Sequence, residues 1–270
     1  MMAARLRQSG LTLVEVLVGM AVGIIVTGGA VAIYASSVRS GNEALLASKL
    51  NQELGALMHV MTNDIRRAGF WGTALGSRAD ENPFNMPGAT ALVVRNDMTG
   101  DALQSATGQG SCITYAYDAT YIGGNVAGTV EATDLFGFRL NGTTVEMRQT
   151  GTVDGVACAG GTCLSCNNGS WLEVTDPDIV EITELTFDLS NSQCLNASEP
   201  NEEDDNGDGT IDEDAEQDCY VTLPPVGSEE VTMETREVQI SLTGRLVADT
   251  SVQGTVTQSV GVRNHVLRTW

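Results

Sequence analysis

Residues 10–34 read GLTLVEVLVGMAVGIIVTGGAVAIY. An α-helix rises about 1.5 Å per residue, so the apolar run from Leu11 to Tyr34 is long enough to cross a hydrocarbon core roughly 30 Å thick. Arg5 and Arg7 precede this run, and basic residues keep a flanking segment on the cytoplasmic side. A secretory signal peptide would have a shorter apolar region, followed by a small-residue cleavage site. The stretch therefore predicts a membrane helix behind a short basic leader.

Glu15 is the only charged residue of the apolar run. A carboxylate at the centre of a membrane helix costs about 2.5–3.5 kcal/mol on insertion scales, and such groups are usually functional. One interpretation is that Glu15 lies close enough to the helix end to reach the interface. The other is that it pairs with a cation. Cleavage after Gly10 would remove only the leader and create such a cation, the α-amino group of Leu11 on a neighbouring subunit.

The arrangement of Gly10, Leu11 and Glu15 resembles the prepilin-peptidase site of type IV pilins and related pseudopilins. The resemblance implies that the peptidase cuts between Gly10 and Leu11 and methylates the new α-amino group of Leu11. It also implies that Glu15 guides subunit docking during assembly. The first mature residue of this family is usually Phe, so Leu11 departs from the pattern. We expect a single-pass inner-membrane protein before assembly and an extracellular pilus fibre afterwards.

The helix is predicted to continue as an amphipathic segment over residues 35–69. Apolar residues recur there in steps of three and four, which places them on one helix face. Gly69 follows them and is typical of a helix stop. The apolar positions are Leu46, Leu50, Leu54, Leu57, Met61, Ile65 and Ala68. The predicted parts of the chain are a leader (1–10), a membrane half (11–34) and an amphipathic half (35–69) of one helix, and a head (70–270).

The head is predicted to be rich in β-strands. Asn141 and Gly142 lie between two alternating runs and indicate a hairpin with a type I′ turn. A helix followed by clustered strands is typical of the α+β class. We therefore expect a type IV pilin-like fold, in which the long helix packs against an antiparallel β-sheet with disulfide-stapled loops. The expected strands are Ser111–Tyr117, Phe136–Leu140, Thr143–Arg148, Ile179–Leu189, Glu237–Val247 and Gly254–Val262.

The chain is strongly acidic, with 35 Asp and Glu against 14 Lys and Arg. Contacts to phosphate need a basic surface, so we expect no direct binding to nucleic acid. The sequence has no P-loop, GxSxG or HExxH motif. We therefore expect a structural protein and not an enzyme.

The six cysteines all follow the apolar run: Cys112, Cys158, Cys163, Cys166, Cys194 and Cys219. An even number in an exported head favours disulfides in an oxidising compartment, and the sequence does not choose among the possible pairings. Cys194 and Cys219 bracket an acidic loop at residues 199–218, so we predict that they pair. The close spacing of Cys158, Cys163 and Cys166 is also compatible with zinc.

The acidic loop contains the pattern D-x-[DN]-x-[DN]-G, which is typical of a calcium-binding loop. Asp204, Asn206 and Asp208 occupy its positions one, three and five. Position twelve is Ala215 where the pattern has a bidentate Glu, so Glu213, Asp214 or Glu216 would have to substitute. The alternative is a solvated acidic loop without a cation. The predicted calcium ligands are Asp204, Asn206, Asp208, Thr210, Asp212 and Glu216.

Residues 64–72, DIRRAGFWG, end the predicted helix. Locally the string is explained by a basic last turn that complements the helix dipole, a glycine stop and two aromatic residues under the head. It also resembles the end of the first helix in minor pilins of the PilW type. Residues 262–264 match that family loosely.

The PilW resemblance implies a minor pilin that primes pilus assembly at or near the fibre tip. Its implied partners are the prepilin peptidase, the other minor pilins, the major pilin and a large tip adhesin. One alternative is a J-like minor pseudopilin of a type II secretion system, which gene neighbours would distinguish. Another is a calcium-dependent adhesive module on a pilin stalk, and an enzyme tethered by the helix is a third.

Overall fold

The computed structural model describes residues 12–72, 82–119, 130–151 and 163–270. The predicted leader, the predicted cleavage site at Gly10 and Leu11, and Cys158 lie outside the described residues. The chain divides into two compact units, Met1–Ser48 and Lys49–Trp270.

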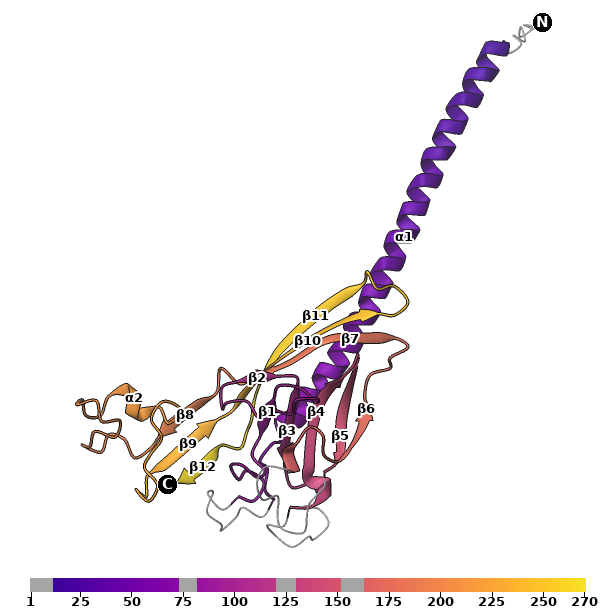
Figure 1. The fold of residues 1–270 in the computed structure, drawn as a ribbon. Coiled ribbons are helices and arrows are strands. Elements are labelled where there is room, and N and C mark those ends of the chain that lie inside the picture. Colours follow the sequence, from indigo (N-terminus) through magenta and orange to yellow (C-terminus); the bar gives the residue numbers. More distant parts are fainter. Residues whose placement is uncertain (1–11, 73–81, 120–129, 152–162) are drawn as a thin grey trace, which may run out of the picture. The chain divides into compact units, whose positions relative to one another are not determined.

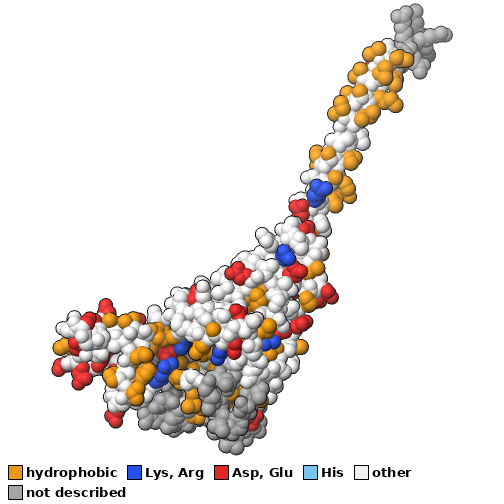
Figure 2. All heavy atoms as spheres, viewed as in Figure 1, with side chains coloured by type: hydrophobic (Ala, Val, Ile, Leu, Met, Phe, Trp, Pro, Cys, Tyr) orange, Lys and Arg blue, Asp and Glu red, His pale blue; other side chains and the backbone are white. Residues whose placement is uncertain are grey.

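Helix α1 spans Leu13–Ile65 (Figure 1). An 18-residue stretch of it has a mean hydropathy of 2.4, and none of that stretch is buried. A helix that is apolar all round needs an apolar environment. Figure 2 shows the exposed hydrophobic side chains along this part of α1. By length and composition α1 can therefore cross a membrane, as expected.

The second unit contains the amphipathic end of α1. The predicted apolar face is buried from Leu50 onward, because the head covers it. The sequence pattern missed Met58, which is also buried. The buried residues of α1 are Leu50, Leu54, Leu57, Met58, Met61, Thr62 and Ile65.

The described residues of the head form three antiparallel sheets. The first has the order β1-β3-β4-β5-β6, the second β11-β10-β7-β2 and the third β12-β9-β8. The strands are β1 (Val93–Arg95), β2 (Gln109–Gly110), β3 (Cys112–Ala116), β4 (Leu135–Asn141), β5 (Thr144–Thr150), β6 (Ser170–Glu173), β7 (Val180–Asp188), β8 (Gln193–Asn196), β9 (Val231–Thr235), β10 (Glu237–Leu246), β11 (Gln253–Gly261) and β12 (Val266–Thr269). A 3-10 turn, η3 (Ala132–Asp134), precedes β4, and a short helix, α2 (Asp214–Gln217), follows β8.

The α+β prediction is confirmed, and the antiparallel arrangement divides into three sheets where one was expected. The six expected strands correspond to β3, β4, β5, β7, β10 and β11. The strands without a sequence prediction have two to five residues. Such short segments have too few residues to establish an alternating pattern.

The β4–β5 hairpin is confirmed, but its turn lies one residue later than predicted. Asn141 pairs with Thr144, so Gly142 and Thr143 are the two turn residues. Gly142 has φ +62°, and Thr143 is not among the residues with positive φ. A positive φ at the first turn residue alone matches a type II′ turn and not the predicted type I′. The sequence has glycine at the position where type II′ requires it.

Helix α1 packs closely on β10 at Gly244. A Cβ atom built there would lie 3.1 Å from both Leu54 Cδ2 and Ile182 Cδ1. Figure 1 shows the end of α1 beside β7 and β10. A glycine at this position therefore permits the short distance between helix and sheet.

We predict that Gly244→Val destabilises the head by about 1–3 kcal/mol, because overpacking forces its neighbours apart. Gly261→Val on β11 is a matched control, since no atom of the described chain lies within 4 Å of a Cβ there. Urea unfolding of the full-length protein in detergent, followed by near-UV circular dichroism, measures both. Equal stability of the two variants would contradict the close packing at Gly244.

Candidate functional site

The start of α1 is closed by a reciprocal pair of contacts between Thr12 and Glu15. Glu15 Oε2 accepts hydrogen bonds from the backbone N–H and the hydroxyl of Thr12, each at 3.1 Å. The Glu15 N–H donates to Thr12 Oγ1 at 3.3 Å. This is a capping box, whose sequence signal is Thr-x-x-Glu. These hydrogen bonds, which were not predicted from the sequence, give Glu15 a local structural role besides the predicted docking role.

The other end of α1 is held by β3. The hydroxyls of Tyr115 and Tyr117 donate to the two carboxylate oxygens of Asp64, at 2.6 and 2.8 Å. Burial and the Asp64 carboxylate raise the pKa of both tyrosines, so the hydroxyls stay protonated donors. The guanidinium of Arg67 lies 4.1 Å from the ring centroid of Tyr117. Tyr117 in turn stacks on Phe136, with 3.8 Å between their ring centroids.

Gly69 ends the helical turn, as predicted. Its φ is +72°, which is favourable for glycine. Its N–H donates to the carbonyl of Ala116 at 2.8 Å, and its carbonyl accepts from Asn82 Nδ2 at 2.8 Å. A Cβ at Gly69 would lie 3.0 Å from Asn85 Nδ2. The turn is therefore locked between β3 and the segment that begins at Asn82.

Residues near the C-terminus also hold the end of α1 and the turn that follows it. Asn264 Nδ2 donates to the carbonyl of Ala68 at 2.9 Å, and the Arg263 N–H donates to the carbonyl of Arg66 at 3.3 Å. Both carbonyls lie in the turn that directly follows α1. The two strings that resemble the PilW type, residues 64–72 and 262–264, are therefore in direct contact.

The acidic loop is closed by a disulfide between Cys194 and Cys219, the pair predicted from the sequence. Figure 2 shows acidic side chains gathered on the part of the head that holds α2 and β8. Glu216 on α2 is buried and accepts hydrogen bonds from the N–H groups of Asp205 at 2.6 Å and Asp212 at 2.7 Å. Glu216, a predicted calcium ligand, therefore organises the backbone of the loop.

The first predicted calcium ligands also bond to the loop backbone. Asp204 Oδ1 accepts from the N–H groups of Gly207 at 2.7 Å and Asp208 at 3.1 Å. Asp204 Oδ2 accepts from Gly209 at 2.8 Å. Asn206 Oδ1 accepts from Asp208 at 2.8 Å. These contacts turn the loop around the carboxylate of Asp204.

The remaining predicted ligands continue this pattern. The Thr210 N–H donates to Asp208 Oδ1 at 2.8 Å. Asp212 Oδ1 accepts from Asn201 at 2.8 Å and from Glu202 at 2.9 Å. Hydrogen bonds from backbone N–H groups to its carboxylates thus order the loop. Calcium binding by the predicted ligands stays a prediction.

A different group of acidic side chains does come together. Ligand oxygens of Glu199, Asp205 and Glu230 all lie within 4.8 Å of one another. Burial first, and then the neighbouring Asp205 carboxylate, raise the pKa of Glu199 to about 7. Spacing along the chain does not reveal this group, because Glu199 and Glu230 are far apart in the sequence and belong to no motif.

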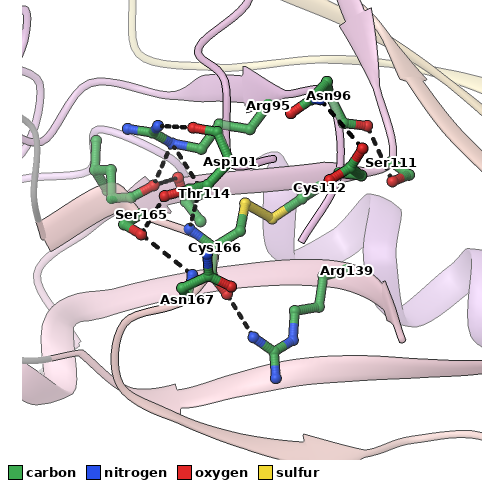
Figure 3. Close-up of a disulfide and its surroundings, with 12 residues drawn as sticks. Arg95, Asn96, Asp101, Ser111, Cys112, Thr114, Arg139, Ser165, Cys166 and Asn167 are labelled. Carbon is green, nitrogen blue, oxygen red and sulfur yellow. Dashed lines mark hydrogen bonds and ion pairs between the residues drawn. A yellow bond between two sulfur atoms is a disulfide. The ribbon is translucent and has the colours of Figure 1, made fainter. Parts of the chain in front are cut away.

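The second described disulfide joins Cys112 to Cys166 (Figure 3). The Cys166 N–H donates to Asp101 Oδ1 at 2.8 Å, and its carbonyl accepts from Arg139 Nη1 at 2.5 Å. Cys163 is disulfide-bonded as well. The zinc interpretation is therefore wrong, since two of its three thiols are oxidised.

Two family models match the chain. One, described as Prepilin peptidase-dependent protein B, matches residues 43–262. The other, described as Prokaryotic N-terminal methylation motif, matches residues 5–31. Neither the curated proteins nor the solved structures contain a match.

We predict that Asp64→Ala destabilises the head by about 1–3 kcal/mol, because the buried Tyr115 hydroxyl loses its acceptor. Replacing both partners can be nearly neutral. Tyr115→Phe with Tyr117→Phe should therefore recover part of the loss when combined with Asp64→Ala. Urea unfolding of all variants forms a double-mutant cycle. Strictly additive losses would show that these hydrogen bonds do not hold the helix end.

Proposed function

Because the chain belongs to the prepilin peptidase-dependent protein B family, we propose that it is a minor pilin of the PilW type that takes part in type IV pilus assembly. The observation that carries this proposal is the combination of an N-terminal methylation motif with a long, exposed apolar helix. The role is structural and not catalytic. The peptidase would cut between Gly10 and Leu11 and methylate Leu11.

The exposed apolar surface of α1 supports a role in assembly. Its side chains need cover, which the membrane supplies before assembly and neighbouring helices supply in a fibre. Glu15 is exposed at the start of this helix. Its carboxylate would pair with the α-amino group of Leu11 on a neighbouring subunit and so set the register of docking.

The negative charge of the head supports a small number of copies in each fibre. The chain carries a formal net charge of −21, so closely packed copies would repel one another. We therefore place the protein at or near the tip, together with other minor pilins, the major pilin and a large tip adhesin. A J-like pseudopilin of a secretion system would share the anchor, and the neighbouring genes would separate the two assignments.

We also propose that the acidic loop binds calcium through Asp204, Asn206 and Asp208, with Thr210, Asp212 and Glu216 completing the site. The order of small acids and glycines supports this. Positive φ values at Gly207 and Gly209 give the sharp turns that such a loop needs. A bound cation would offset the repulsion among its carboxylates.

We predict that Glu15→Ala and Glu15→Gln are both processed normally and both fail to enter pili. Gln can keep the capping box but lacks the charge. Immunoblots of membrane and sheared pilus fractions measure processing and incorporation. Normal incorporation of Glu15→Gln with failure of Glu15→Ala would show that capping, and not the charge, is what assembly requires.

We predict that chelation of calcium lowers the melting temperature of the purified protein and that Asp208→Ala abolishes this response. At about 100 times Kd, a ligand adds about 2.7 kcal/mol, which corresponds to roughly 5–10 °C for a domain of this size. Thermal scans with and without chelator measure the shift. Absence of both a thermal shift and a heat of binding in the unmodified protein would refute the site.

A further inference from the structure

Strand β11 is the longest edge strand of the three described sheets (Figure 1). It has nine residues, whereas the other edge strands, β1, β2, β6, β8 and β12, have two to four. An edge strand presents unpaired backbone groups, and proteins commonly keep such strands short for that reason. The length of β11 is therefore an exception within its own head.

The hydrogen bonds between β11 and β10 use the even-numbered residues of β11. The Leu246 N–H donates to the carbonyl of Val252 at 3.1 Å, and the Val262 N–H donates to the carbonyl of Arg236 at 2.9 Å. The register between these two contacts is continuous. Hydrogen-bonded pairs alternate along an antiparallel ladder, so the backbone groups of the odd-numbered residues point to the free edge. These residues are Gln253, Thr255, Thr257, Ser259 and Gly261.

The free edge of β11 is open and unprotected. Its odd-numbered residues are all exposed, and no hydrogen bond found in the described part of the chain uses their backbone groups. The strand contains no charged residue and no proline, and its pairing with β10 contains no bulge. Charges, prolines and bulges are the usual features that prevent an edge from pairing. The backbone groups on this edge are therefore available to another strand.

We propose that β11 pairs edge to edge with β11 of a second copy of the chain, antiparallel and centred on Thr257. In this register Thr257 lies opposite Thr257 of the second copy, and Thr255 lies opposite Ser259 of the second copy. The paired residues all have odd numbers, so their backbone groups already point to the partner. Each such pair would exchange two hydrogen bonds. The two sheets that contain β11 would then join into one continuous sheet.

The side chains of β11 are compatible with this register. The hydroxyl of Thr255 contacts that of Thr243 on β10 at 3.0 Å, and the hydroxyl of Thr257 contacts that of Ser241 at 3.4 Å. These contacts place the hydroxyl groups of both strands on one sheet face. Opposed Thr–Thr and Thr–Ser pairs across strands are favourable. The proposed pairing would continue this row of hydroxyl groups into the second copy.

The charge of the chain indicates why the occupant is a second copy. A net charge of −21 means that copies repel wherever their contact carries acid. Residues 250–262 contain no charged residue, and repulsion from more distant charges is screened over about 8 Å at physiological ionic strength. A strand rich in Lys or Arg would find no carboxylate on β11 to bind. The uncharged edge therefore favours a copy of itself, in the membrane-anchored protein before assembly.

Cysteine cross-linking tests the register in membranes from cells that express the full-length chain. The described cysteines have no free thiol. Under mild oxidation Thr257→Cys should form a covalent dimer, because hydrogen-bonded pairs have Cα atoms about 5.5 Å apart, within disulfide range. Thr255→Cys alone should not, because its two copies would lie about 14 Å apart. Co-expression of Thr255→Cys with Ser259→Cys should restore the covalent dimer.

Sedimentation of the full-length protein in detergent measures the dissociation constant of the dimer. Thr257→Pro removes the N–H of the central pair from both copies, so the constant should rise at least about tenfold. The fold should tolerate this change, because the lost N–H points away from β10. Thr257→Lys places like charges opposite each other and should also weaken the dimer. Thr183→Lys, at an exposed threonine on β7, is the matched control and should have no effect.

Raising the salt concentration should lower the dissociation constant, because salt screens the repulsion between the two acidic chains. Equal cross-linking of Thr255→Cys and Thr257→Cys would overturn the proposal, as would no covalent dimer from Thr257→Cys. A dimer that resists both Thr257→Pro and Thr257→Lys would place the contact elsewhere, for example along α1, and would also overturn it. None of these results bears on pilus incorporation, which the Glu15 variants test separately.

Discussion

The structure depends on covering the apolar surface of one helix, α1. From Leu50 to Ile65 the apolar face is narrow, and β-sheets of the head bury it. Nearer its start the helix is apolar all round, and no side chain of its most apolar stretch is buried. Exposed apolar surface is unfavourable in water. One helix is therefore suited to two environments, the interior of its own head and an apolar surrounding such as a membrane.

The end of α1 is where the head is fastened to this helix. Asp64 accepts hydrogen bonds from two tyrosine hydroxyls, one on β3 and one on the residue that follows it. Asn264, from the far end of the chain, donates to the carbonyl of Ala68 in the turn after α1. These contacts give a physical reason for the string at residues 64–72. Asp64 is a hydrogen-bond acceptor for the sheet. Gly69 has a positive φ, which residues with a side chain rarely adopt. The local explanation by helix dipole and glycine stop was therefore incomplete.

Prediction succeeded where a pattern is long and local. The helix periodicity, the longer strands and the Cys194–Cys219 disulfide follow from spacing along the chain. The hairpin turn was shifted by one residue, because Gly142 can serve either turn type and strand register decides between them. The capping box of Glu15 was present in the sequence as Thr-x-x-Glu but was hidden within a membrane-like run. The zinc interpretation failed because Cys112, which forms a disulfide with Cys166, is 54 residues away.

By itself, the sequence determined the apolar helix, its amphipathic continuation, the α+β class and the acidic loop, because each depends on residues close together in the chain. Only the tertiary structure decided the division into three sheets, the meeting of residues 64–72 with 262–264, and the grouping of Glu199 and Asp205 with Glu230. Those features depend on which distant segments pack together. Burial and charge at such contacts arise from neighbours that spacing along the chain does not reveal.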